Sequence, residues 1–570
     1  MERKHLLKYL FMASVFFTCL PLIAQKYVPE YLHAHFDRTF YVAGEDMWYS
    51  VYFLNPYTRQ SEILYVELID PEGNYLMRQT LKVQGDQAHG DFALPPLLER
   101  GYYQFRAYTK WNLNFAPQEI YSEYIAIFPA KLSKEKPVAE EPTSDQVSDS
   151  LGLITLKQPA VKPRENIDIT LKEMNGVGSI SIIDLKFVRD IDRNRIIERV
   201  REVKQKPIIP PKGGEPEIQP ETKYTKTFML RQPGTKDYIT SNFIAGFVQQ
   251  THQKLMKPSE GGIVTFEFND FYDSSVVQFF DANPFKASYI PLVSMINDDV
   301  PIDPPEPSQK QPTLTPEILR YIRDYQKRFQ LNNLFGNRNN MRAEKPVVLP
   351  STIEATSSYK VDNYIGFTKM EDFIKHTVPP VKLKMPKKNS DERPLFKLYV
   401  PHKEVIRGIK VVEKPPLLLV NDYFTYDIES VLDLQWDNVL QVDVFNTAEK
   451  LPRQFGPIGD FGVIAFQTRD GQTPPAIKET ENNLKIEGFY LPRKFEVPDY
   501  SKSGSSSSRV PNLRPVLYWN PNITLNNQED RTITLPAGDQ PGKYLVQLEG
   551  VDKNGIAFYS EAIIEITINR

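Results

Sequence analysis

The 570-residue sequence has a single cysteine, Cys19, and it lies within the first 25 residues. This stretch has a basic start, an apolar run and a plausible cleavage point after Gln25, which is the pattern of an export signal. We expect Cys19 to be removed with the signal (1–25) rather than lipidated, because apolar residues continue past it. The mature chain would then have no thiol, no disulfide and no cysteine ligand for a metal.

Charge of one sign and long apolar runs are also missing. The 69 Lys and Arg nearly balance the 72 Asp and Glu, for a net charge of −3, so no basic stripe is available for a phosphate backbone. After the signal, no apolar segment approaches the roughly 20 residues of a membrane span. We therefore predict a periplasmic protein, or one peripheral at the outer membrane, with no nucleic-acid partner and no transmembrane span in the mature chain.

Catalytic motifs are absent as well. The sequence has no P-loop, nucleophile elbow or paired-carboxylate motif, and we expect no enzyme activity and no cofactor. His33, His35 and Asp37 alternate along a predicted strand and would share one face, as zinc ligands could. The sequence has no second histidine cluster, so we favour an edge strand, with Asp37 and Arg38 in the turn that follows it, and no metal site.

Proline and aromatic residues are abundant instead. The 47 Pro and the 63 Tyr and Phe favour β domains joined by stiff linkers. Strand patterns at 47–53, 63–69 and 102–109, with a turn at 70–74, predict a β-sandwich over 26–130.

Within this region, "HFDRTFYVAGEDMWYSVYF", followed by "YVELIDPEGN" and "GYYQFRAYTKW", resembles the macroglobulin-type (MG2-like) domain of alpha-2-macroglobulin relatives, in the form found in exported Bacteroidota proteins. The resemblance implies the same β-sandwich. Relatives that trap proteases use a thioester made by Cys and Gln. Since the mature chain lacks cysteine, we expect no such trapping.

The next part of the chain is less regular. A charged, Pro-containing linker (131–150) precedes one or two further small β-sandwich units within 151–300, which a Pro-rich stretch interrupts at 204–222. A linker and an amphipathic helix follow in 301–344. Thr315 caps this helix, and one face carries Ile318, Ile322, Tyr325 and Phe329. This face either packs on a neighbouring domain or binds a partner.

Residues 345–475 have mixed α and β character. A capping box at Thr368 and Glu371 starts a helix, and short strands alternate with short helices from 417 to 466. This region resembles the plug domain of TonB-dependent receptors in two segments, "PPLLLVNDYFTYDIES" and "GPIGDFGVIAFQT". No TonB box and no barrel are recognisable in the sequence. Whether the module couples to TonB stays open.

The strand pattern of residues 485–570 predicts a C-terminal β-sandwich. The predicted fold class is thus a multi-domain, mainly β protein, with macroglobulin/Ig-like β-sandwiches, a small α/β plug-like domain and the C-terminal sandwich.

The plug-like region supplies the candidate partner-binding residues. Its apolar stretches run to their ends, and glycines 456, 459 and 462 permit close approach of another backbone. The candidates are Asn421, Asp422, Tyr423, Phe424, Phe455 and Phe461. Either a partner or the terminal sandwich covers this face. The basic stretch 382–394 is interpreted as a solvated loop rather than a lipid-binding patch, because Asp391 and Glu392 interrupt it.

The predicted function is a non-enzymatic periplasmic protein-binding or scaffold protein associated with outer-membrane transport or assembly machinery. Its expected partner is an outer-membrane protein or receptor complex. The alternative is a carbohydrate- or peptide-binding module that hands its ligand to an outer-membrane receptor. In that case aromatic residues such as Trp436 and Trp519 would line a groove.

Overall fold

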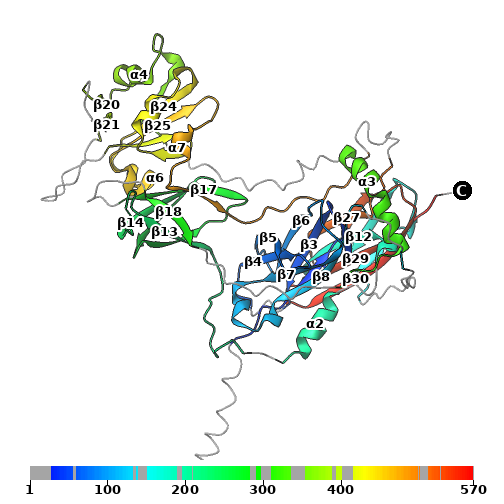
Figure 1. Ribbon diagram of the computed structural model, residues 1–570. Coiled ribbons are helices and arrows are strands. Elements are labelled where there is room, and N and C mark those ends of the chain that lie inside the picture. Colours follow the sequence, from blue (N-terminus) through cyan, green and yellow to red (C-terminus); the bar gives the residue numbers. More distant parts are fainter. Residues whose placement is uncertain are drawn as a thin grey trace, which may run out of the picture. The chain divides into compact units, whose positions relative to one another are not determined.

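The computed structural model divides the chain into two compact units (Figure 1). Unit 1 comprises Met1–Thr222, Val300–Glu344 and Tyr490–Arg570, and unit 2 comprises Lys223–Asp299 and Lys345–Phe489. The structure describes residues 27–54, 59–131, 137–138, 151–188, 195–207, 210–235, 237–282, 291–296, 310–335, 354–387, 393–400, 415–498, 500, 511–526 and 528–568. The predicted signal and Cys19 lie outside them. Within the described ranges, no helix is both long and apolar enough to cross a membrane.

Sandwich I of unit 1 packs a three-stranded sheet, in the order β1-β3-β6, against a five-stranded sheet, in the order β2-β8-β7-β4-β5. The strand bounds are Leu32–Phe36 (β1), Phe40–Val42 (β2), Asp46–Phe53 (β3), Ile63–Ile69 (β4), Tyr75–Lys82 (β5), Gln87–Ala93 (β6), Gly101–Tyr108 (β7) and Tyr121–Phe128 (β8). Alternate residues such as Tyr49, Leu68 and Phe105 fill the space between the sheets. This confirms the sandwich predicted over 26–130.

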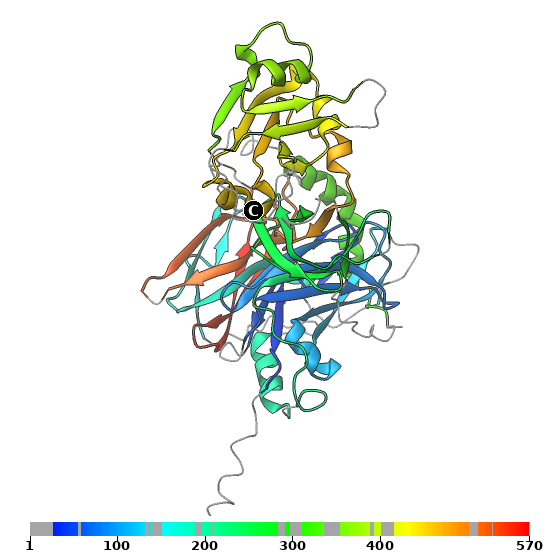
Figure 2. The same cartoon turned by 90° about the vertical axis from the view of Figure 1, so that its left-hand side faces the viewer.

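Sandwich II is built from two distant parts of the chain. Its sheets have the orders β9-β11-β28 and β10-β30-β29-β12-β27. The bounds are Ile154–Leu156 (β9), Ala160–Val161 (β10), Asn166–Leu171 (β11), Gly176–Asp184 (β12), Val516–Leu525 (β27), Arg531–Pro536 (β28), Gly542–Asp552 (β29) and Ala557–Ile566 (β30). Ile169 and Ile182 from the first part share one core with Leu548 and Ile564 from the second. In Figures 1 and 2 the cyan strands lie beside the orange and red ones.

The two sandwiches follow the same plan. β1 to β8 correspond in sheet order to β9 to β12 followed by β27 to β30, including a parallel pair at one edge, β2 with β8 and β10 with β30. The turn 70–74 of sandwich I is replaced in sandwich II by everything between β12 and β27. The prediction of a separate C-terminal sandwich over 485–570 is therefore wrong, because these strands complete a sandwich that opens at residue 154.

Sandwich III lies in unit 2 and has sheets of the orders β16-β13-β18 and β15-β14-β17-β26. The bounds are Tyr224–Arg231 (β13), Ser241–Val248 (β14), Gln253–Ser259 (β15), Ile263–Phe268 (β16), Ser274–Asp281 (β17), Leu292–Ile296 (β18) and Asn483–Glu487 (β26). The rings of Phe228 and Phe279 meet between the sheets with centroids 4.8 Å apart. The region predicted as one or two sandwiches (151–300) thus holds half of sandwich II and most of sandwich III.

An α/β module lies between β18 and β26 in the chain. Its five-stranded sheet has the order β19-β24-β25-β22-β23, beside a β20-β21 hairpin. The strands are Ser357–Lys360 (β19), Val381–Lys384 (β20), Leu395–Leu398 (β21), Leu417–Val420 (β22), Tyr423–Thr425 (β23), Val439–Phe445 (β24) and Val463–Thr468 (β25), and the helices are Met370–Thr377 (α4), Ile428–Leu432 (α5), Leu451–Phe455 (α6) and Pro475–Lys478 (α7). The predicted capping box is wrong: Lys369, not Thr368, is the N-cap of α4, and no side chain caps it.

Among the described residues of unit 1, two segments form α-helices. Helix α2 (Ile196–Gln205) packs beside β30, and helix α3 (Pro316–Phe335) packs on the edge formed by β2 and β8. The Thr315 hydroxyl accepts a hydrogen bond from the Ile318 N–H at 3.2 Å, as predicted for the cap. Ile318 and Ile322 are buried against sandwich I, so the neighbouring-domain alternative holds for α3. The side chain of Phe329 lies outside the described residues.

Candidate functional site

Sandwiches I and II meet through buried polar side chains, which we call the polar joint: His33, His35, Tyr52, Ser179 and Glu549. His33 Nε2 lies 2.7 Å from a carboxylate oxygen of Glu549, and His35 Nδ1 lies 2.6 Å from the Ser179 hydroxyl. The Tyr52 hydroxyl donates to the Ser179 oxygen at 2.7 Å. None of the five residues is more than 3% exposed. Side chains of one sandwich therefore find their partners on the other.

Strand alternation explains which side chains enter the joint. On β1, Leu32 and Ala34 point into the core of sandwich I, so His33 and His35 point away from it. On β29, Leu548 points into the core of sandwich II and Glu549 away. The shared face of the two histidines was expected from the sequence, but their partners were missed. Polar residues alternating along a strand usually indicate a solvated face, and here a second sandwich covers it.

Burial sets the charge states of the joint. It lowers the pKa of His35 to about 4, so this ring is uncharged at neutral pH. Burial acts to raise the pKa of the Glu549 carboxyl, but the two histidines and hydrogen bonds from His33 and Gln547 outweigh it and hold the pKa below its usual value. A neutral His35 therefore lies near an ionised Glu549 inside the protein.

Several polar atoms in and around the joint have no hydrogen-bond partner. They are His33 Nδ1, His35 Nε2, Gln87 Oε1 and Trp519 Nε1. The Trp519 ring meets the His35 ring edge-on at 5.0 Å. Each unsatisfied buried group costs about 1–3 kcal/mol of folding free energy. Water molecules bound to these atoms would reduce this cost.

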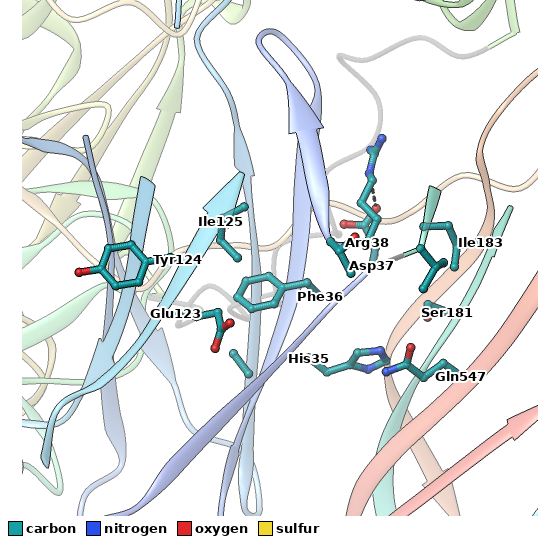
Figure 3. A pocket seen from close by; sticks show the side chains of 13 residues that line it. His35, Phe36, Asp37, Arg38, Glu123, Tyr124, Ile125, Ser181, Ile183 and Gln547 are labelled. Atoms are coloured by element: carbon teal, nitrogen blue, oxygen red, sulfur yellow. Dashed lines mark hydrogen bonds and ion pairs between the residues drawn. The ribbon is translucent and has the colours of Figure 1, made fainter. Parts of the chain in front are cut away.

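A small cavity of about 50 Å³ opens beside the joint. His35, Ser181 and Gln547 line one side of it, and Phe36 and Ile125 line the other. Figure 3 shows His35 and Gln547 pointing toward one another and Phe36 turned away from them. This volume suits a few water molecules. It is far below the roughly 300–1,000 Å³ of typical ligand pockets.

A second polar cluster ties α3 to sandwich I. The Arg38 guanidinium donates to the Tyr321 hydroxyl at 2.9 Å and to the Glu45 carboxylate at 3.2 Å. The Tyr321 hydroxyl donates to the other Glu45 oxygen at 2.5 Å. Asp37 accepts hydrogen bonds from the Tyr41 hydroxyl and the Trp48 N–H. Asp37 and Arg38 thus serve the turn after β1, as favoured from the sequence.

The zinc alternative weighed for His33, His35 and Asp37 finds no geometric support. The three side chains bind different partners: a glutamate, a serine and a tyrosine. Across the described ranges, no cluster of three His, Cys, Asp or Glu side chains is arranged to hold a metal ion.

Two of the candidate partner-binding residues pack inside unit 2. Phe455 is 1% exposed and lies in a cluster with Ala245 and Phe280 of sandwich III. The Phe424 ring lies 4.7 Å from the Phe247 ring of β14. Sandwich III therefore covers the apolar face of the α/β module, for which a partner and the terminal sandwich had been the alternatives. Phe455 and Phe424 thus have packing partners within unit 2, and their partner role stays a prediction.

Sandwich III also closes the edge of the module's sheet at β23. The Gln278 side chain accepts from the Phe424 N–H at 2.8 Å and donates to the Phe424 carbonyl at 3.1 Å. Gln249 donates to the Asp422 carbonyl at 3.2 Å. A side-chain amide thus takes the place of a further strand and blocks edge pairing there.

Asn421, Asp422 and Tyr423 lie around the turn between β22 and β23, whereas Phe461 lies just before β25, at the other end of the parallel pair β22-β25. Asn421 has a φ of 50° and binds Thr468 through its side chain, so it holds the turn between β22 and β23. Tyr423 and Phe461 are half-buried, and the Asp422 side chain is exposed. The structure therefore does not bring all six candidates together, and of the six only Asp422 is exposed.

Close approach at the predicted glycines is made by the chain itself. Gly462 has a φ of 87°, and a Cβ there would collide with the Leu398 side chain of the β20-β21 hairpin. A Cβ at Gly459 would collide with Phe455. Gly459 and Gly462 therefore serve internal packing, whereas a Cβ at Gly456 would only reach ordinary contact with Met256.

The aromatic groove of the alternative function does not form from the expected residues. Trp519 is 2% exposed. Trp436 packs against Phe367 and Phe373 in the module, with ring centroids 5.7 and 4.8 Å away. Both tryptophans are packing residues. They do not line the groove that the carbohydrate- or peptide-binding alternative requires.

No protein-family model matches the sequence, and no curated protein is similar to it. Among solved structures, the chain is similar to Escherichia coli alpha-2-macroglobulin activated by porcine elastase, with 9% identity and a TM-score of 0.24 over 94% of this chain and 44% of that chain. Salmonella alpha-2-macroglobulin reacted with methylamine gives 11% identity and a TM-score of 0.23 over 95% and 40%. The chain spans less than half of these proteins. The similarity is distant and says nothing of activity. The plug and Bacteroidota resemblances stay predictions.

Proposed function

We propose that this protein is a non-enzymatic, exported scaffold that binds another protein through its α/β module, in association with outer-membrane transport or assembly machinery. The observation that carries the proposal is the nested chain path: sandwich III interrupts sandwich II, and the module interrupts sandwich III. Each insertion leaves and re-enters through elements of the same sandwich. A module tied at both ends is held more firmly than one on a terminal linker, which suits presentation to a partner.

The use of the polar side chains supports a non-enzymatic role. The hydrogen bonds of His33, His35 and Glu549 join the two sandwiches. The Arg38 guanidinium binds Tyr321 of α3. The cavity beside them holds about 50 Å³. Groups of this kind in a catalytic site would converge on space for a substrate.

The binding test uses the exposed Asp422. A photo-crosslinking residue placed at position 422 of the exported, full-length protein should give an adduct with a defined partner protein in intact cells. The control carries the same residue at Thr532, which is exposed on sandwich II, and should not give that adduct. The proposal fails if position 422 gives no adduct, or the same adducts as position 532.

Export is tested separately by the mass of the protein purified from cells. We expect a mature chain that begins near Lys26 and carries no lipid, because Cys19 is removed with the signal. A chain that begins at an acylated Cys19 would contradict this and would anchor the scaffold covalently.

A further inference from the structure

One end of the sheet in the α/β module gathers four connections. Strand β24 is antiparallel to β19 and to β25, and β22 is parallel to β25. The chain therefore leaves β19, β22 and β25 at the same end, where it also enters β23 and β24. We call this end of the sheet the loop end. Its connections are residues 361–369, 421–422, 433–438 and 469–474.

An isoleucine protrudes from the first of these connections. Gly366 has a φ of 93°, which lets the chain bend between Tyr364 and Phe367. Both of these aromatic side chains pack against the module's core, whereas Ile365 is 96% exposed. Turns usually carry small or polar residues, and an isoleucine this exposed adds nothing to the packing of the turn. The two anchored rings instead hold it outward.

Two more apolar side chains extend the surface at this end. The Phe367 ring lies 5.7 Å from the ring of Trp436, which is half-buried. Leu440, the second residue of β24, is 39% exposed. A few side chains that fill pockets near the centre of a protein interface carry most of its binding energy. Ile365 has the position and the shape of such an anchor.

The loop end is also acidic. Its four connections contain five Asp against one Lys and one Arg, a net charge of −3, and all five Asp are exposed. The Arg469 guanidinium pairs with Asp362, and its N–H donates to the Asn438 carbonyl at 2.7 Å. Among the described residues, three of the carboxylates have no ion-pair partner: Asp422, Asp433 and Asp437.

This charge decides between possible occupants. Nucleic acid and anionic lipid headgroups are negative, so the carboxylates would repel them. A neutral partner would remove water from the carboxylates without compensating their charge. A protein surface that carries Lys or Arg around an apolar pocket complements both the carboxylates and the isoleucine.

We propose that the loop end docks on a protein partner, with Ile365 in an apolar pocket and Asp422, Asp433 and Asp437 facing Lys or Arg around that pocket. The inference rests on the proposed function, because it names the surface and the partner chemistry of the same module. Burial of the Ile365 side chain contributes about 10- to 100-fold to the affinity. The carboxylates act mainly on the rate of association and on the choice of partner.

The test places a photo-crosslinking residue at the exposed Thr368 of the exported, full-length protein. We expect an adduct in intact cells with the same protein that position 422 captures. Ile365→Ser should lower the yield of this adduct about tenfold, without changing the unfolding midpoint. In a parallel sample a carbodiimide, which joins carboxylates to lysine amines, should link Asp422, Asp433 or Asp437 to lysines of that protein, as peptide mass spectrometry detects.

The matched control is Leu97→Ser, which removes an apolar side chain that is 91% exposed in sandwich I and should keep the yield within twofold. The proposal is overturned if position 368 gives no adduct or the adducts of position 532, if Ile365→Ser matches the wild type, or if Leu97→Ser loses as much. It is also overturned if the carbodiimide links no carboxylate of the loop end to the partner. An adduct at position 422 that Ile365→Ser leaves unchanged would keep the proposed function and reject this surface, whereas no adduct at either position would reject both.

Discussion

Sandwich I and sandwich II share one eight-strand plan but differ in how the chain supplies it. Sandwich I runs without a large interruption from Leu32 to Phe128, whereas sandwich II needs Ile154–Asp184 and Val516–Ile566. Strand order is the same in both because pairing and core packing, rather than closeness in sequence, specify the fold. A hairpin turn accepts a folded insertion because its two ends already lie side by side, and loop-closure entropy grows only slowly with length.

The difference also has a kinetic side. Every strand of sandwich I is available once residue 128 has been synthesised. Sandwich II lacks four of its eight strands until the C-terminal segment appears, and β11 and β12 must find partners more than 330 residues away. Contacts of such sequence separation form slowly. We therefore expect sandwich I to fold first and sandwich II to be completed last.

The largest predicted effect comes from removing residues 511–570. Sandwich I should keep its fold, while the first half of sandwich II should expose Ile169 and Ile182 together with unpaired strand edges, and the protein should aggregate. Hydrogen exchange measured by mass spectrometry should show lost protection in β11 and β12 and retained protection in β3 and β4. Slow exchange in β11 and β12 of the truncated chain would show that the two sandwiches do not differ in this way.

The next effect is a loss of stability in acid. The pKa of His35 is lowered from 6.5 to about 4 by burial. Between these two pH values, His35 binds a proton in the unfolded chain but not in the folded chain. Stability is therefore present above about pH 6.5 and is lost as pH falls toward 4, by up to about 3 kcal/mol. The depressed pKa of Glu549 adds a further loss below about pH 4.5. Trp519, beside His35, reports urea unfolding of this joint by fluorescence once the other three of the four tryptophans have been replaced by Phe.

Two variants check that the joint causes this pH dependence. His35→Gln should make the stability profile less steep between pH 6.5 and 4, and part of the slope should remain because burial also lowers the pKa of His89 to about 4. His376→Gln, at an exposed histidine of α4, should leave the profile unchanged. A profile as steep in the His35 variant as in the wild type would show that His35 does not cause the loss.

A smaller effect is expected when sandwich I is given an insertion at the matching point. Twenty Gly/Ser residues placed after Gly73, in the turn between β4 and β5, should cost about 1–2 kcal/mol of unfolding free energy. The same linker placed after Val66, within β4, should prevent folding because it breaks the strand. Urea unfolding of both variants is the measurement. If the turn insertion also prevents folding, the two hairpins are not equivalent.

The smallest effect concerns α3, which covers an edge of sandwich I. Tyr321→Phe removes the hydrogen bonds to Glu45 and Arg38 and should cost about 1 kcal/mol. Amides of α3 should exchange faster, and those of sandwich II should not. The control is Tyr399→Phe, at an exposed tyrosine, which should leave hydrogen exchange unchanged. An equal effect in both variants would show that the Tyr321 hydroxyl does not hold α3.

Local patterns in the sequence predicted local structure well. The apolar run at 417–420 is β22, the aromatic-rich run at 47–53 lies within β3, and Pro316 begins α3 behind its Thr315 cap. These features follow from alternation, capping and proline geometry, which neighbouring residues determine. The capping box at Thr368 failed, because Lys369 is the N-cap of α4.

Pairings between distant segments were not predictable. Thr170 pairs with Thr532, and His33 with Glu549, across 362 and 516 residues. Nothing near Glu549 distinguishes it from a solvated strand residue, and nothing near Phe455 shows that sandwich III rather than a partner covers it. Such choices depend on which buried surfaces fit one another, which a single sequence does not display.

The central claim, that the C-terminal strands complete sandwich II, is tested most directly by a disulfide. Thr170 and Thr532 lie opposite one another with their hydroxyl oxygens 3.5 Å apart, and Thr155 pairs with Thr170 from the other side. In a chain with Cys19 replaced by Ser, T170C/T532C should form a disulfide that peptide mass spectrometry detects. T155C/T532C should not, since two strand spacings separate its cysteines by about 10 Å. A free thiol at position 532 in the first variant, or an equal disulfide yield in the second, would contradict the account.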